Sequence, residues 1–77
     1  MKGDIAMQRW EYRVVMPHWV NGFLFARYVD DQELKNWKKT PLRTFLLELG
    51  ADGWEMTGTI SITGSPMQCL FFKRPLP

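Results

Sequence analysis

The 77-residue sequence contains one cysteine, Cys69, and one histidine, His18. A single cysteine excludes a disulfide within the chain, and a structural zinc site needs about four Cys or His ligands. No apolar run reaches the roughly 18 residues of a membrane-spanning helix. Ten basic and eight acidic residues leave a net charge of +2, which is too small to indicate nucleic-acid binding by itself. We therefore expect no metal site, no cofactor and no contact with a membrane.

The residues that are present indicate a single globular domain. Hydrophobic residues make up 45% of the chain, and the aromatic residues, four Trp among them, supply large side chains for a core. A domain below about 70–80 residues nevertheless rarely gains more than about 3–5 kcal/mol from its core. Because neither a disulfide nor a metal is available, we expect the chain to form a homodimer or a higher oligomer. The alternative is a tightly packed monomer.

The first residues differ from the rest of the chain. Residues 1–7 contain no apolar stretch long enough for a signal peptide. We expect a disordered lead-in over residues 1–7 and one domain over residues 8–77. Cys69 lies in a strand-like run, and a lone cysteine is typical of a reducing compartment, so we expect a cytoplasmic protein.

Alternating side chains predict a strand over residues 9–16. Its expected core face carries Trp10, Tyr12, Val14 and Met16. Asn21-Gly22 then predicts a two-residue hairpin turn, since both residues tolerate a positive φ. In the register of that turn, Val20 pairs with Phe23, Trp19 with Leu24, His18 with Phe25, Pro17 with Ala26, Met16 with Arg27 and Val14 with Val29. Arg13 then lies opposite Asp30, which makes a favourable cross-strand charge pair.

Pro17 limits this hairpin, because it has no N–H to donate. The register therefore requires that the other edge of the first strand is unpaired at Pro17. Two interpretations of residues 17–39 stay open. In the first, these residues form a hairpin strand followed by a short helix. In the second, they form an irregular insertion with a loop over residues 18–22.

Helical signals follow the hairpin. The segment 30–39 has acidic residues at its start and basic residues at its end, which matches a helix dipole and predicts a short helix or helical turn. Thr40 as N-cap and Pro41 as the first helical residue predict a longer helix. Its expected apolar stripe is Leu42, Phe45, Leu46 and Leu49. We expect Gly53 to end it in the left-handed conformation.

Two further strands complete the chain. Residues 54–63 alternate, which places Trp54, Met56, Gly58, Ile60 and Ile62 on one expected face. Residues 67–74 return with a continuous apolar run from Cys69 to Phe72, which indicates a central strand. The predicted fold class is α+β in the order ββαββ. It has an antiparallel sheet of three to four strands, one main helix packed on one face, and a short extra helix.

Three blocks of the sequence, Trp10–Val15, Leu46–Met56 and Leu70–Pro75, resemble a known family. It is the group of small bacterial proteins called domain of unknown function 4177, and its most specific block is Gly50–Glu55. The resemblance implies the fold described above and implies no activity, cofactor or catalytic residue. Residues 17–39 are longer than the corresponding part of that family and look like an elaboration.

Candidate catalytic groups are sparse. Cys69 lies in an apolar strand, where burial makes a thiol unreactive, and His18 lies between Pro17 and Trp19 in the hairpin. The Gly50–Gly53 segment follows a helix, whereas a phosphate-binding loop precedes one. We expect no catalytic residue and no enzyme activity.

Binding functions remain. Val15, Trp19, Leu24 and Tyr28 fall opposite the expected core face and, with Trp37, form the expected partner-binding surface. We therefore expect a protein-interaction or regulatory module that acts as a homo-oligomer, with another protein as a further partner. The alternative is a nucleic-acid-binding module. In that case Lys35, Lys38, Lys39 and Arg43 bind phosphates, and Trp37 stacks on a base.

Overall fold

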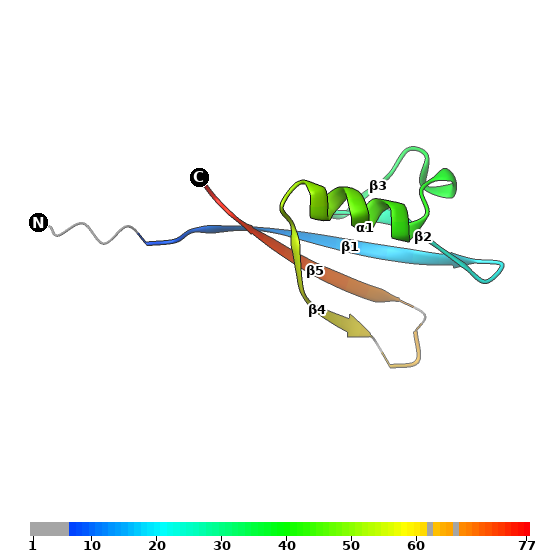
Figure 1. Cartoon of the computed structure of the whole chain (residues 1–77). Coiled ribbons are helices and arrows are strands. Elements are labelled where there is room, and N and C mark those ends of the chain that lie inside the picture. The colour runs from blue at the N-terminus through cyan, green and yellow to red at the C-terminus, as the bar shows by residue number, and fades with distance from the viewer. Residues whose placement is uncertain (1–6, 62, 66) are drawn as a thin grey trace, which may run out of the picture.

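The computed structural model describes residues 7–61, 63–65 and 67–77. The fold class is α+β: a five-stranded antiparallel sheet with one α-helix and one 3-10 turn. The elements are β1 (Trp10–Val20), β2 (Phe23–Val29), β3 (Gln32–Glu33), η1 (Trp37–Lys39), α1 (Leu42–Ala51), β4 (Glu55–Ser61) and β5 (Gln68–Pro75). The strand order in the sheet is β3-β2-β1-β5-β4 (Figure 1). The expectation of three to four strands is wrong, because β3 adds a two-residue strand at one edge.

The Asn21-Gly22 turn forms as predicted. Both residues have positive φ, 51° and 82°, and the pairs Val20–Phe23, Trp19–Leu24, His18–Phe25 and Pro17–Ala26 are confirmed. The ladder between β1 and β5 ends at Val15, so the missing N–H of Pro17 interrupts no hydrogen bond to β5. The interpretation of residues 18–22 as an irregular loop is therefore wrong.

The register changes beyond Pro17. Met16 pairs with Tyr28 and Val15 pairs with Val29, so Arg27 is an extra, bulged residue in β2. The predicted pairs of Met16 with Arg27 and of Val14 with Val29 are wrong for this reason. The bulge also moves Tyr28 onto the face opposite Val15, because paired residues share a face and neighbours alternate.

The segment 30–39 is not a helix. Asp30 and Asp31 have positive φ, 51° and 68°, and they turn the chain into β3, so only η1 is helical. Asp30 stabilises this turn: its Oδ1 accepts a hydrogen bond from the Val14 N–H at 2.9 Å, and its Oδ2 accepts one from Arg13 Nε at 3.1 Å. The predicted Arg13–Asp30 ion pair is confirmed, although Asp30 belongs to a turn and not to a strand.

Replacing Asp30 with alanine should lower the free energy of unfolding by about 1–2 kcal/mol. The Val14 N–H loses its acceptor, and alanine is strained in the left-handed conformation. Asp30→Asn keeps an oxygen acceptor and tolerates the positive φ, so its loss should stay below about 1 kcal/mol. Urea denaturation followed by far-UV circular dichroism measures both. Equal losses for the two variants would contradict this role of Asp30.

The start of α1 differs from the prediction, and its end agrees with it. Thr40 is not the N-cap: its hydroxyl donates to the Asn36 carbonyl at 2.8 Å. Pro41 is the N-cap residue with an extended ψ of 139°, and α1 begins at Leu42 without a side-chain cap. Gly53 has a φ of 89° after the last helical turn, as expected. The Trp54 N–H then donates to the Leu49 carbonyl at 2.9 Å, which leads the chain into β4.

The strand β4 is an edge strand and carries a bulge. Met56 pairs with Phe72 and Gly58 with Phe71, so Thr57 has no partner in the ladder. Met56 and Ile60 therefore lie on opposite faces, and the single face expected for residues 54–62 is wrong. Ile62 lies outside the described residues. The central position expected for residues 67–74 is confirmed, because β5 lies between β1 and β4.

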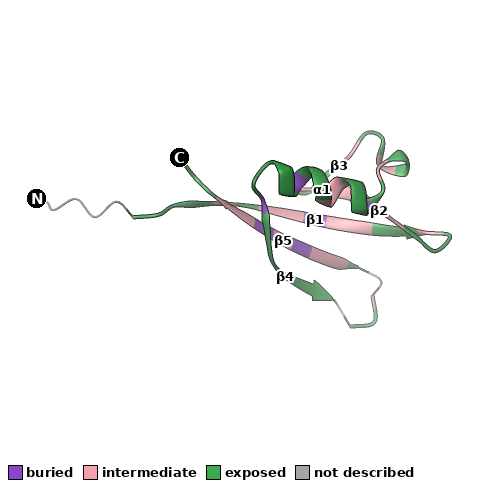
Figure 2. Ribbon diagram, in the orientation of Figure 1, coloured by how far each residue is buried: buried purple, intermediate pink, exposed green. Residues whose placement is uncertain are grey.

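The core lies between α1 and one face of the sheet (Figure 2). Its buried residues are Val15, Ala26, Leu42, Leu49, Trp54, Leu70 and Phe72. Val15 and Ala26 have no exposed surface, whereas Tyr12 is 68% exposed. The predicted core face of Trp10, Tyr12, Val14 and Met16 is therefore wrong, and the odd-numbered side chains of β1 face the helix instead.

Trp54 is the largest side chain of the core and lies between two arginines. The guanidinium carbons of Arg13 and Arg74 lie 4.7 Å and 4.5 Å from its ring centroid. Arg13 is held by Asp30, and Arg74 Nε donates to Glu11 at 2.8 Å. These contacts fasten the end of α1 to β1 and β5, which gives Trp54 a structural role.

Candidate functional site

The sheet face opposite α1 carries apolar side chains across its centre. Strand pairing places side chains from four strands on it. We call this surface the open sheet face; its members are Tyr12, Val14, Met16, Phe25, Tyr28, Gly58, Ile60, Cys69 and Phe71. None of them is buried, and Tyr12 and Ile60 are 68% and 54% exposed. Among the described residues, α1 packs on the other face, and Trp37 of η1 contacts His18 and Phe25 at one corner of this face.

Charged groups lie at the margins of the open sheet face. Lys73 pairs with Tyr12 and with Glu55 across the strands, and its Nζ lies 4.1 Å from the centroid of the Trp10 ring. At the β3 edge, Arg27 Nε donates to Glu33 at 2.9 Å. An apolar centre with a charged margin is the usual arrangement of a protein interface.

The corner covered by η1 is an aromatic cluster around Trp37. The His18 and Phe25 rings lie edge-on to it, with centroids 5.2 Å and 6.3 Å away. The Arg27 guanidinium carbon lies 4.5 Å from the Trp37 ring centroid. Because these side chains already contact the ring, Trp37 packs η1 against the sheet and is half-buried.

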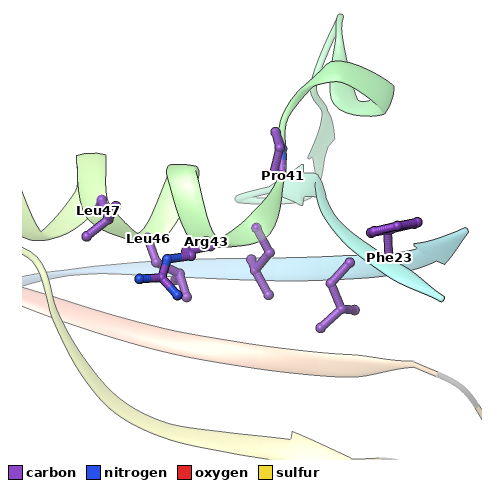
Figure 3. A pocket seen from close by; sticks show the side chains of 7 residues that line it. Phe23, Pro41, Arg43, Leu46 and Leu47 are labelled. Atoms are coloured by element: carbon purple, nitrogen blue, oxygen red, sulfur yellow. The ribbon is translucent and has the colours of Figure 1, made fainter.

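A second uncovered surface is a groove on the side of the sheet that carries α1 (Figure 3). It has a volume of about 590 Å³. Its apolar lining consists of Phe23, Leu24, Pro41, Leu42, Leu46 and Leu47. Phe23 comes from the end of β2 and Leu47 from α1; they stand at opposite ends of the groove and are 68% and 67% exposed. Arg43 is its charged residue.

The structure separates the five residues expected to bind a partner. Val15 is fully buried beneath α1, and Leu24 packs against the core. Tyr28 lies on the open sheet face, and Trp37 packs beside it. Trp19 is 55% exposed and lines a small hollow of about 240 Å³ together with Pro17 and Met67. The expected surface is wrong as one continuous face, since Val15 and Tyr28 lie on opposite sides of the sheet.

The five residues of the nucleic-acid alternative are also divided. Lys35, Lys38 and Lys39 are exposed around η1, Trp37 packs against His18 and Phe25, and Arg43 lines the groove on the other side. The Lys38 Nζ lies 5.6 Å from the Trp37 ring centroid, so the pair makes a cation–π contact within the chain. Nucleic-acid binding stays a prediction, which retardation of single-stranded RNA at low salt would test.

The groups considered for catalysis have structural surroundings. Cys69 is a half-buried free thiol on β5, and the His18 ring packs on Trp37. Among residues 7–61, 63–65 and 67–77, no three His, Cys, Asp or Glu side chains gather in a group that could hold a metal ion. In the same residues, no helix is long and apolar enough to cross a membrane.

The open sheet face and the groove are features that sequence reasoning missed. A signal for the first was present, because both faces of β1 and β5 carry apolar residues. For the groove, the available signal was Leu47, an apolar residue outside the expected apolar stripe of the helix, which is 67% exposed in the structure. Comparison of the chain with protein-family models, curated proteins and solved structures found no match. The resemblance to domain of unknown function 4177 therefore stays a prediction.

Proposed function

We propose that this chain is a protein-interaction module that acts as a homo-oligomer, with a second copy covering the open sheet face. The observation that carries the proposal is the uncovered apolar centre of that face. Tyr12, Ile60 and Phe71 come from three adjacent strands and have no covering layer in the described chain. Sheets that expose one such face are usually covered by another layer.

The size of the core supports association. Among the residues that the structure describes, seven apolar residues are buried, and of these only Val15 and Ala26 have no exposed surface. A chain of this length gains only about 3–5 kcal/mol from a single core. Covering the second face of the sheet would remove further aromatic surface from water, at roughly 25 cal/mol per Å².

The size of the face is also suitable. Four strands spaced about 4.8 Å apart, each about seven residues long at roughly 3.3 Å per residue, give a flat area of about 400 Å². Stable interfaces bury roughly 800 Å² of accessible surface on each partner. Because side chains protrude from the sheet, its accessible surface is larger than this flat area. A face-to-face dimer would therefore bury most of the open sheet face. A charge at its centre should then prevent association.

A second copy is the favoured occupant because the face can complement itself. Its centre is uncharged, and its margin carries both signs, with Lys73 and Arg27 as cations and Glu33 and Glu55 as anions. A two-fold axis through the centre brings the same patch of both chains together, so no like charges need to meet in the apolar part. Sheet-on-sheet packing of this kind is common.

We expect light scattering after size exclusion to give at least twice the 9.1 kDa chain mass across a dilution series. Tyr12→Glu should reduce the mass to that of one chain, because the new carboxylate would lose its water at the interface, and Lys73 opposite it offsets only part of that cost. Leu47→Glu is the matched control, since Leu47 is equally exposed but lies on α1; it should leave the mass unchanged.

The reactivity of Cys69 is a second measurement. Cys69 should react faster with a thiol reagent in the Tyr12→Glu variant, because Cys69 lies on the same face as Tyr12. A monomeric wild-type protein at every concentration would refute the proposal.

A further inference from the structure

The groove beside α1 is a separate surface from the open sheet face, since its lining, apart from Phe23 at the hairpin, comes from α1, its N-cap Pro41 and the core-facing Leu24 of β2. Phe23 and Leu47 are among the most exposed large apolar side chains of the described residues. The buried Leu42 and the half-buried Leu46 also line the groove, so its apolar surface runs from Phe23 at the hairpin to Leu47 in the middle of α1 (Figure 3). Continuous exposed apolar surfaces of this kind mark binding sites.

We propose that this groove binds an acidic amphipathic α-helix of a partner protein. The lining decides the conformation of the occupant. Apart from Arg43, every lining side chain is apolar, so the groove offers few hydrogen-bond partners for a peptide backbone. An extended segment would leave its own N–H and C=O groups unpaired there, whereas a helix pairs them internally. Helices that place apolar side chains into such grooves are an established mode of recognition.

The charge around the groove decides the character of the occupant. Arg43 is the charged residue of the lining, and the segment 41–47, which supplies most of that lining, contains no acidic residue. Arg43 makes no ion pair with any residue that the structure describes. A partner helix with Asp or Glu beside its apolar stripe would therefore find complementary charge, and a basic helix would be repelled.

The length of α1 decides how much of a helix can dock. Ten helical residues extend about 15 Å, or roughly three turns. A partner helix aligned with α1 would place apolar residues at positions i, i+3 or i+4, and i+7 against Leu46, Leu42 and Phe23. Its acidic residues would lie within reach of Arg43.

The test uses two fluorescent, alanine-based helical probe peptides of about 16 residues. Both carry leucines at i, i+4 and i+7; one has glutamate beside the leucines and the other has lysine. Fluorescence anisotropy with the full chain should show saturable binding of the glutamate probe, roughly fivefold tighter than that of the lysine probe. Arg43→Glu should reverse this preference. Leu47→Glu should abolish binding of both probes, whereas Tyr12→Glu on the open sheet face should leave binding intact.

Three results would overturn the inference. The first is an absence of saturable binding by the glutamate probe. The second is binding that survives Leu47→Glu, which would place the probe elsewhere. The third is a lower solution mass for Leu47→Glu, which would assign the groove to contact between copies of this chain. The solution mass of Tyr12→Glu tests the proposed function and not the groove. The two proposals can therefore fail separately.

Discussion

The Trp54→Ala variant should be largely unfolded at room temperature. Trp54 is 6% exposed, and removal of a buried tryptophan side chain costs about 3–5 kcal/mol. That loss is about as large as the whole stability expected from a core of this size. The variant would also leave the inner sides of Arg13 and Arg74 without the ring that they cover.

Far-UV circular dichroism and urea denaturation measure this effect without the tryptophan signal. Trp19→Ala is the matched control, because Trp19 is 55% exposed and lies near the tip of the hairpin. Its free energy of unfolding should change by less than about 1 kcal/mol. A folded Trp54→Ala variant with near wild-type stability would show that the contacts between Trp54 and the two arginines do not support the fold.

The second large effect separates two neighbouring phenylalanines of β5. Phe72 is 3% exposed and lies beneath α1, whereas Phe71 is half-buried on the open sheet face. Phe72→Ala should lower the free energy of unfolding by about 3–5 kcal/mol, because it opens a cavity in the core. Phe71→Ala removes a side chain that the single chain leaves partly in water, so its cost to the monomer should be about 1 kcal/mol.

The same pair of variants also tests the proposed oligomer. Phe71→Ala should weaken association and lower the solution mass at dilutions where the wild-type protein stays associated. Unfolding is best compared at low protein concentration, because association adds to apparent stability. A larger loss of monomer stability for Phe71→Ala than for Phe72→Ala would contradict the assignment of the two faces.

Local signals predicted most of the secondary structure. The Asn21-Gly22 turn, the left-handed Gly53 and the central position of residues 67–74 were all predictable, because each depends on the backbone preferences or the apolar content of a few neighbouring residues. For the segment 30–39, the predicted short helix or helical turn is confirmed only as the 3-10 turn Trp37–Lys39. The charge order of the segment fits a helix dipole, but Asp30 and Asp31 adopt the left-handed conformation, in which Asp30 binds the Val14 N–H. An interaction between residues far apart in the chain was stronger than the local preference.

The candidate surfaces were less predictable than the fold. Alternation along β1 indicated two faces correctly, but both faces are apolar, so the pattern did not say which one α1 would cover. The bulge at Arg27 then exchanged the sides of Tyr28 and Val29 relative to the predicted register. A shift of one residue moves every later side chain to the other face, so one unpredicted bulge was enough to disperse the expected partner-binding surface.

By itself, the sequence determined four of the strands, the main helix and its end at Gly53, the hairpin with its turn, and the α+β class, since these follow from local backbone chemistry and side-chain periodicity. The covered face was decided only by the tertiary structure. The chain passes through α1 between β3 and β4, which are parallel strands at opposite edges of the sheet. Such crossovers are right-handed in nearly all proteins, so the strand order selects the face that the helix covers. That order places Val15 in the core and Tyr12 in solvent. It also leaves uncovered the open sheet face on which the proposed function depends.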